Sequence, residues 1–166
     1  MDRARLDVDF LRLLNEHRGA LHRVCRTYAD GPDDREELLQ EIVYQLWRAL
    51  PSYRREAAPI TWIYRIALNT AITALRRRSR RPLLVSLEVA AEVPASAPEV
   101  DRSGQGELLY RAIRRLGEVE RALLMCHLDG LSYRQIGTVL GISETNVGAR
   151  LSRIRAKLQE LVVETK

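Results

Sequence analysis

Residues 131–144 carry the sequence LSYRQIGTVLGISE, whose spacing predicts two helices joined by a tight turn. Ser132 and Gln135 stand three residues apart, as in a capping box that starts a helix, and Gly141 is placed to end it. Ser143 is then expected to cap the next helix. This pattern is typical of a helix-turn-helix, which places its second helix in the major groove of DNA. A plain two-helix hairpin is the alternative.

The helix after this turn is predicted to have a buried seam and an opposite face of small residues. The seam has apolar residues at alternating spacings of four and three: Val147, Leu151, Ile154, Leu158 and Leu161. The opposite face holds the small residues Thr145, Ala149, Ser152 and Ala156. These would let the helix approach the floor of a groove, with basic and amide groups at its flanks. We expect the following residues to contact DNA: Thr145, Asn146, Arg150, Ser152 and Arg153.

A second helix with DNA-binding character is predicted over residues 60–80, entered through Pro59. On a helical wheel its apolar residues gather on one side: Ile60, Ile63, Tyr64, Ala67, Ala71, Ala74 and Leu75. The opposite stripe combines an aromatic ring for stacking, an amide and a hydroxyl for base edges, and arginines for phosphates. Its members are Trp62, Arg65, Asn69, Thr73, Arg76 and Arg80. The alternative is a solvated helix face with Trp62 packed into a neighbour.

The rest of the N-terminal sequence predicts two further helices. One runs from about Asp9 to Ala29 and stops at the Asp-Gly-Pro of residues 30–32. The next begins at residues 33–34, where Asp34 and Glu37 have the spacing of a capping box, and ends before Pro51. Its buried stripe is expected to be Leu39, Ile42, Val43, Leu46 and Leu50. Since no segment alternates with the period of a strand, we expect an all-α fold.

The charge pattern predicts two small helical domains joined by an extended linker. Residues 51–81 hold eight basic residues and one acidic residue, and residues 110–166 hold ten and six. Between them, residues 82–106 contain three prolines and a Ser-Gly-Gln-Gly run, which is typical of a flexible tether. The expected divisions are therefore a domain at 1–81, an acidic linker at 82–106 and a domain at 107–166.

Composition excludes several classes of function. The chain has 166 residues and a net charge of +5, and its basic side chains are almost all arginine, which suits phosphate binding. Two distant cysteines and three histidines do not form a disulfide framework or a zinc cluster. There is no glycine-rich phosphate loop and no recognisable catalytic grouping. We expect a soluble, cytoplasmic, non-enzymatic protein with no metal or other cofactor and no membrane insertion.

Taken together, these motifs resemble the extracytoplasmic-function (ECF, group 4) sigma factors, a branch of the sigma-70 family, from Phe10 to Leu161. Residues 34–50 are similar to the helix that grips the clamp coiled coil of RNA polymerase. Residues 60–81 are similar to the helix that melts promoters and reads the −10 element, and the helix-turn-helix is similar to the −35 reader. A single short linker with no intervening domain is characteristic of this group.

The resemblance implies specific roles and partners. The expected contacts with the polymerase clamp are Gln40, Glu41, Gln45 and Arg48. The loop from Ser52 to Pro59 would hold a base flipped out of the promoter, and Asn69 would help to read the −10 element. The implied partners are core RNA polymerase, through its clamp coiled coil and its flap, promoter DNA, and an anti-sigma factor. The linker would thread through the polymerase near its RNA exit path.

The sequence departs from the family pattern at three positions. Gly137 stands where the family usually has alanine, and Gly148 and Ala149 stand where a basic residue and a hydroxyl are frequent.

Two alternative functions each leave one feature of the sequence unexplained. A stand-alone helix-turn-helix regulator with a sensory domain leaves the charge of +7 over residues 51–81 unexplained. An RNA-binding or scaffolding protein leaves the helix-turn-helix spacing unexplained. A transcription initiation factor accounts for both.

Overall fold

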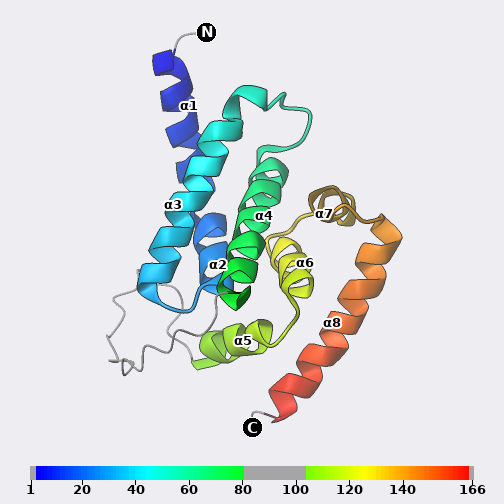
Figure 1. Ribbon diagram of the computed structural model, residues 1–166. Coiled ribbons are helices and arrows are strands. Elements are labelled where there is room, and N and C mark those ends of the chain that lie inside the picture. The colour runs from blue at the N-terminus through cyan, green and yellow to red at the C-terminus, as the bar shows by residue number, and fades with distance from the viewer. Residues whose placement is uncertain (1–2, 81–103, 165–166) are drawn as a thin grey trace.

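The computed structural model describes residues 3–80 and 104–164, and within these two ranges the regular secondary structure is helical throughout (Figure 1). The first range holds α1 (Arg3–Glu16), α2 (Arg18–Tyr28), α3 (Pro32–Ala49), a short 3₁₀ turn η1 (Leu50–Ser52) and α4 (Pro59–Arg80). The second holds α5 (Gly104–Arg114), α6 (Glu118–Leu128), α7 (Tyr133–Leu140) and α8 (Glu144–Glu164). The expected all-α fold is confirmed.

The N-terminal domain is a bundle in which α2, α3 and α4 pack against one another. Ile42 and Leu46 of α3 and Tyr64 of α4 are fully buried in its core. Helix α1 lies at one end of the bundle, where Phe10 packs edge-on against Trp47 of α3 with ring centroids 5.1 Å apart. Helix α4 matches its predicted span, and the expected burial of Ile63, Ala67 and Ala71 is confirmed.

Two predictions for the N-terminal helices are wrong. The single helix expected over residues 9–29 begins earlier, at Arg3, and is interrupted at His17, so that it forms two helices. Gly19 lies two residues further on and lowers the helix propensity at this point. The Asp34 capping box does not form either, because α3 begins at Pro32 after Gly31, and its N-cap has no side-chain hydrogen bond. Proline suits the first helical position since it lacks the amide hydrogen that would be unpaired there.

The C-terminal domain confirms the helix-turn-helix. The Ser132 hydroxyl accepts from the Gln135 amide at 3.1 Å, and the Gln135 side chain accepts from the Ser132 amide at 2.8 Å. Gly141 ends α7 in the left-handed conformation with φ of 70°, which glycine adopts without strain. The Ser143 hydroxyl accepts from the Asn146 amide at 3.2 Å and so starts α8. Val147, Leu151 and Ile154 are buried as expected.

The two domains pack against each other. Helix α4 lies against α6 and α7, and α2 lies against α5 and α6 (Figure 1). The buried apolar residues of both domains form one continuous cluster. Most of the linker predicted at residues 82–106 lies outside the described residues, but α5 already begins at Gly104, inside the predicted linker.

Candidate nucleic-acid and polymerase interfaces

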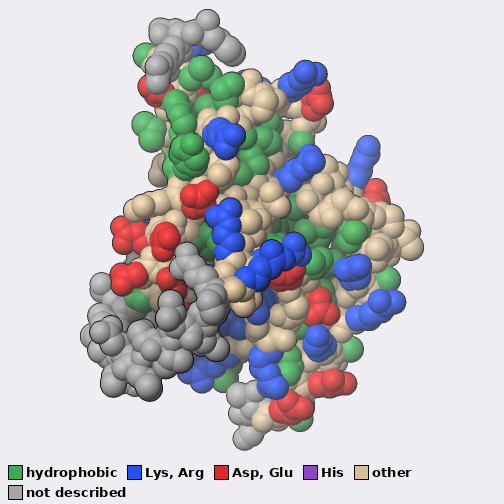
Figure 2. All heavy atoms as spheres, in the orientation of Figure 1, with side chains coloured by type: hydrophobic (Ala, Val, Ile, Leu, Met, Phe, Trp, Pro, Cys, Tyr) green, Lys and Arg blue, Asp and Glu red, His purple; other side chains and the backbone are tan. Residues whose placement is uncertain are grey.

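The predicted DNA-facing stripe of α4 lies on the surface as expected. Arg65, Asn69 and Thr73 are exposed along its middle, and Arg76 and Arg80 are exposed toward its end. Basic side chains gather over α4 and over the C-terminal helices on the face shown in Figure 2. One member of the stripe already has a partner, because the Arg76 guanidinium donates to the carboxylate of Glu118 on α6.

Trp62, at the head of the stripe, is half-buried and stacks on Tyr53. Their ring centroids are 4.5 Å apart, with 24° between the planes. The Tyr53 hydroxyl also donates to the carbonyl of Ala57 at 2.8 Å, which closes the loop that precedes α4. Within this loop Arg55 has φ of 57°, a conformation that non-glycine residues rarely adopt. Tyr53 lies inside the loop from Ser52 to Pro59 that was expected to hold a flipped base, but its stack on Trp62 was not predicted.

The predicted DNA-facing residues of α8 divide into two groups. Thr145, Ser152 and Arg153 are exposed, as direct contact with DNA requires. Asn146 and Arg150 are half-buried, and the Arg150 Nε donates to the Asn146 Oδ1 at 3.1 Å. These two side chains therefore present themselves as a hydrogen-bonded pair one helical turn apart.

Steric crowding inside the helix-turn-helix favours glycine at position 137. A Cβ atom at this position would lie 2.6 Å from the carbonyl oxygen of Ile142, where α7 turns into α8. The Gly137 carbonyl accepts hydrogen bonds from the amides of Gly141 and Ile142, so the turn folds back over this residue. An alanine at this position would therefore require the turn to shift.

The predicted polymerase contacts on α3 also lie on the surface, except for one. Gln40, Glu41 and Arg48 are exposed, whereas Gln45 is half-buried and donates to the Glu41 Oε1 at 2.9 Å. Gln45 therefore holds Glu41 in place and borders the buried side of the helix.

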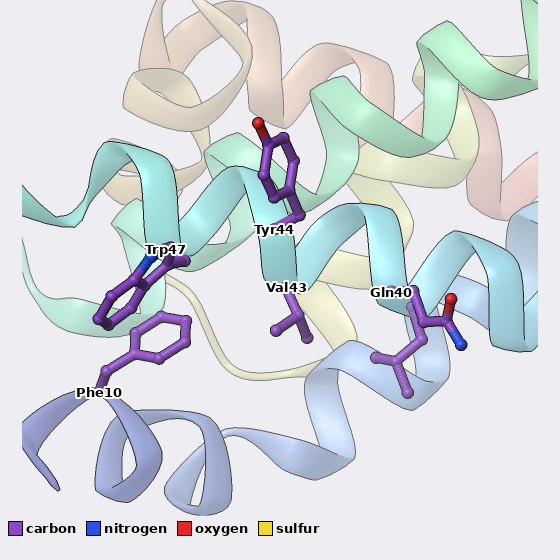
Figure 3. A pocket seen from close by; sticks show the side chains of 6 residues that line it. Phe10, Gln40, Val43, Tyr44 and Trp47 are labelled. Carbon is purple, nitrogen blue, oxygen red and sulfur yellow. The ribbon is translucent and has the colours of Figure 1, made fainter. Parts of the chain in front are cut away.

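An apolar groove of about 460 Å³ lies beside these α3 residues (Figure 3). The period of a single helix does not predict this groove, because the groove forms only where α1 meets α3. Two large apolar side chains at or near the groove are exposed to solvent. Tyr44, which lines the groove, is 57% exposed, and Leu11, which follows the lining residue Phe10 in α1, is 64% exposed. The groove is lined by Phe10, Leu39, Gln40, Val43, Tyr44 and Trp47.

Among the described residues, no group of three or more histidine, cysteine or carboxylate side chains is placed to hold a metal ion. No helix in the described ranges combines the length and apolar character needed to cross a membrane.

An exposed basic helix and a helix-turn-helix on one all-α chain define a DNA-binding protein of the promoter-recognising type. Comparison with protein families agrees: residues 13–81 match sigma-70 region 2, and residues 106–158 match sigma-70 region 4. The chain is 30% identical over 157 residues to the ECF RNA polymerase sigma factor SigM of Mycobacterium tuberculosis, covering 92% of this chain and 76% of that protein. It therefore belongs to the extracytoplasmic-function sigma factors, non-enzymatic transcription initiation factors that direct RNA polymerase to promoters.

Other relatives and solved structures extend this picture. The chain is 30% identical over 147 residues to the ECF RNA polymerase sigma-E factor of Escherichia coli K12, covering 78% of this chain and 74% of that protein. Its fold is similar to the sigma factor RpoE bound to the anti-sigma factor NepR from Bartonella quintana, with a TM-score of 0.72, 24% identity and coverage of 93% and 96%. It is also similar to CnrH in complex with the cytosolic domain of CnrY, with a TM-score of 0.70, 22% identity and coverage of 95% and 89%.

Proposed function

We propose that this sigma factor divides its work among three helices: α3 binds core RNA polymerase, α4 reads and melts the −10 element, and α8 reads the −35 element. The observation that supports this division most strongly is the α4 stripe. Its amide, hydroxyl and arginines are exposed on one side, while its apolar side is fixed in the core. A helix anchored in this way presents its polar groups at fixed positions, as sequence reading requires.

On α4, Asn69 is assigned to base reading. It is exposed midway between Arg65 and Thr73, and its amide offers both a donor and an acceptor to a base edge. Arg80 and Arg76 lie toward the end of the helix and contact phosphates. The Tyr53–Trp62 stack lies at the other end of the stripe, where an unpaired base of the melted strand can stack on an aromatic surface.

On α8, the exposed hydroxyls of Thr145 and Ser152 face the major groove, and Arg153 lies beside them. The exposed Ala149 adds only a methyl group on this side of the helix, so the backbone can come close to the base pairs. Arg150 and Asn146 act as a unit, because the asparagine oxygen holds the guanidinium in one orientation. We propose that this pair contacts the edge of the groove.

On α3, the exposed amide and carboxylate of Gln40 and Glu41 lie next to the apolar groove between α1 and α3 (Figure 3). A helix of a coiled coil carries an apolar stripe flanked by polar groups, and such a stripe fits an apolar groove with a polar rim. We therefore assign this groove and its polar edge, including Arg48, to the clamp coiled coil of the polymerase.

We further propose that the protein acts in the cytoplasm, contacts the polymerase flap through its C-terminal domain, and is held inactive by an anti-sigma factor. Two similar structures support the last point, since one is described as bound to an anti-sigma factor and the other as bound to the cytosolic domain of CnrY.

Reconstituted transcription tests the division of labour. Sigma-free core polymerase is mixed with the chain, and the transcripts that start on genomic DNA are sequenced. We expect starts downstream of one shared pair of −10 and −35 sequences. Starts that are random, or unchanged when the chain is left out, would contradict the proposal. Tight sequence-specific binding to duplex DNA by the isolated chain would favour a stand-alone regulator instead.

A further inference from the structure

Asp129, at the end of α6, connects the two domains. Its carboxylate accepts a hydrogen bond from the Tyr64 hydroxyl of α4 and forms an ion pair with Arg23 of α2 at 2.7 Å. Only 12% of the Asp129 side chain is exposed. Burial and the hydrogen bond to Asp129 raise the pKa of Tyr64 well above its ordinary value, so the phenol remains the donor. One carboxylate of the C-terminal domain thus binds two helices of the N-terminal domain.

Glu118, at the start of α6, makes a second connection. Its carboxylate accepts from the Arg76 guanidinium of α4, with the Nε atom at 2.8 Å. Its backbone carbonyl accepts from the Tyr28 hydroxyl of α2 at 2.6 Å. Both ends of α6 therefore contact the same two helices of the N-terminal domain.

Apolar and cation–π contacts complete this interface. The Thr27 side chain contacts the sulfur of Met125, with its oxygen 3.3 Å away, and the Arg26 guanidinium lies 4.1 Å from the centre of the Tyr110 ring. The buried apolar residues of the two domains form one continuous cluster, and the two carboxylates fix how α6 sits on α2 and α4.

The Nε and one terminal nitrogen of Arg76, which together form one edge of its guanidinium, both donate to Glu118. In the docked arrangement its guanidinium binds the Glu118 carboxylate, although the proposed function assigns it to a promoter phosphate. Carboxylate and phosphate are alternative partners for the same arginine fork. A phosphate that binds this same edge of Arg76 must therefore displace Glu118.

The docked domains also cannot reach both promoter elements. Elements centred at −35 and −10 are separated by about 25 base pairs, or roughly 85 Å of duplex at 3.4 Å per base pair. A compact chain of this length has a radius of gyration of about 15 Å and is about 40 Å across. Simultaneous reading of the two elements therefore requires the domains to separate.

We propose that Glu118 and Asp129 form an intramolecular latch that keeps the two DNA-reading domains docked in the free chain, and that promoter phosphate competes with Glu118 for Arg76 when the chain opens. The competition rests on the proposed function of α4, but the latch is a property of the free chain.

Single-molecule energy transfer on the full chain tests the latch. Dyes are attached to Glu36→Cys on α3 and Gln159→Cys on α8, two exposed positions in different domains. The native Cys25 and Cys126 are buried and do not compete for the dye. The test variant is Glu118→Gln with Asp129→Asn, and Tyr64→Phe removes the same hydrogen bond from the other domain. The matched control is Asp34→Asn, because Asp34 pairs with Arg78 of α4 within the N-terminal domain.

We expect one high-transfer population for the parent chain. The double variant should raise the ratio of open to closed molecules about tenfold, as loss of charged hydrogen bonds predicts, and Tyr64→Phe should raise it about two- to fivefold. Asp34→Asn should leave the ratio unchanged. Added promoter duplex should open the double variant at a lower concentration than the parent chain.

An unchanged ratio in both the double variant and Tyr64→Phe, with circular dichroism showing folded protein, would overturn the latch. An equal rise of the ratio with Asp34→Asn would also overturn the latch, since the opening would then depend on the net charge of the chain and not on the contacts of Glu118 and Asp129. These outcomes are separate from a failure of the proposed function, because the ratio is measured without polymerase. If opening follows the variants but DNA has no effect, the latch stands and the role of Arg76 in phosphate binding is wrong.

Discussion

Tyr53 stacks on Trp62 across the turn that leads from α3 to α4, with 4.5 Å between the ring centroids. The stack covers one face of the Trp62 ring, so a promoter base has access only to the remaining surface of the pair. The Tyr53 hydroxyl is used within the loop, where it donates to the Ala57 carbonyl. The loop and the DNA-facing stripe of α4 are therefore fixed to each other through these two rings.

Replacement of Tyr53 should impair promoter melting. Tyr53→Ala removes the stack, and since such aromatic pairs contribute about 0.5–1.5 kcal/mol, we expect open-complex formation to fall about two- to tenfold. Tyr53→Phe keeps the stack and loses only the hydrogen bond, so open-complex formation should fall less with this variant. Permanganate reactivity of unpaired thymines measures the melted DNA. If Tyr53→Ala melts promoters as well as the parent chain does, the stack has no part in melting.

Asn69→Ala and Arg80→Ala should differ in the kind of effect they produce. Loss of the Asn69 amide removes a base contact and should change which −10 sequences are used. Loss of Arg80 removes a phosphate contact, so all promoters should weaken alike and the salt dependence of binding should decrease by about one counterion. Transcription from randomised −10 libraries measures both. An unchanged preference with Asn69→Ala, or a shifted one with Arg80→Ala, would reverse the two assignments.

Gly137→Ala should destabilise the helix-turn-helix although alanine is the better helix former. Its Cβ would lie 2.6 Å from the Ile142 carbonyl oxygen, and that backbone must shift to admit it. We expect the free energy of unfolding to fall by about 1–3 kcal/mol, as in other overpacked sites. Gly148→Ala in α8 is the matched control, because its Cβ would meet only the Tyr133 ring, at an ordinary contact distance of 3.4 Å. It should be neutral or stabilise by up to about 1 kcal/mol. Urea denaturation measures both, and a stabilising Gly137→Ala would show that the turn is more open.

Alkaline pH should destabilise the folded chain. Burial raises the pKa of Cys25 to about 11 and of Cys126 to about 12, from an ordinary value of 9.0. Since the folded state holds these protons more tightly, their contribution to stability is complete below about pH 9 and is lost as the pH rises through 11 and 12. Urea denaturation at pH 8 and pH 10.5 should show this loss of stability, and Cys126→Ala should make the loss smaller.

The burial of the two thiols can be tested directly. Ellman's reagent should react with neither thiol until urea unfolds the chain. Rapid reaction of the folded protein at pH 8 would contradict the burial of the two thiols.

The elements that the sequence predicts well are those set by local interactions. The capping box of Ser132 and Gln135, the stop at Gly141 and the cap at Ser143 each depend on residues within a few positions of one another. The exposed stripe of α4 follows in the same way from the helical period. Local patterns failed at the start of α3, where Gly31 and Pro32 take precedence over the Asp34 pattern.

What the sequence did not predict depends on distant contacts. Leu68 and Thr61 of α4 are buried although the helical wheel did not place them on its apolar side, since α4 packs against α6 and α7 as well as its own bundle. The groove beside Gln40 needs Phe10 from α1, and the partner of Arg76 is 42 residues away on α6. The period of a single helix cannot predict contacts between residues of different helices.

Binding of core polymerase by α3 tests the central claim most directly. The variant is Gln40→Ala with Glu41→Ala, two exposed side chains at the rim of the groove, and the matched control is Gln159→Ala with Glu160→Ala, the same exposed residue pair on α8. Fluorescence anisotropy of labelled chain titrated with sigma-free core gives the dissociation constant, and circular dichroism checks the fold. We predict that the α3 variant binds at least about tenfold more weakly, as loss of a charged hydrogen bond implies, while the control binds like the parent chain. Normal binding by the folded α3 variant would contradict the assignment of this helix to the polymerase.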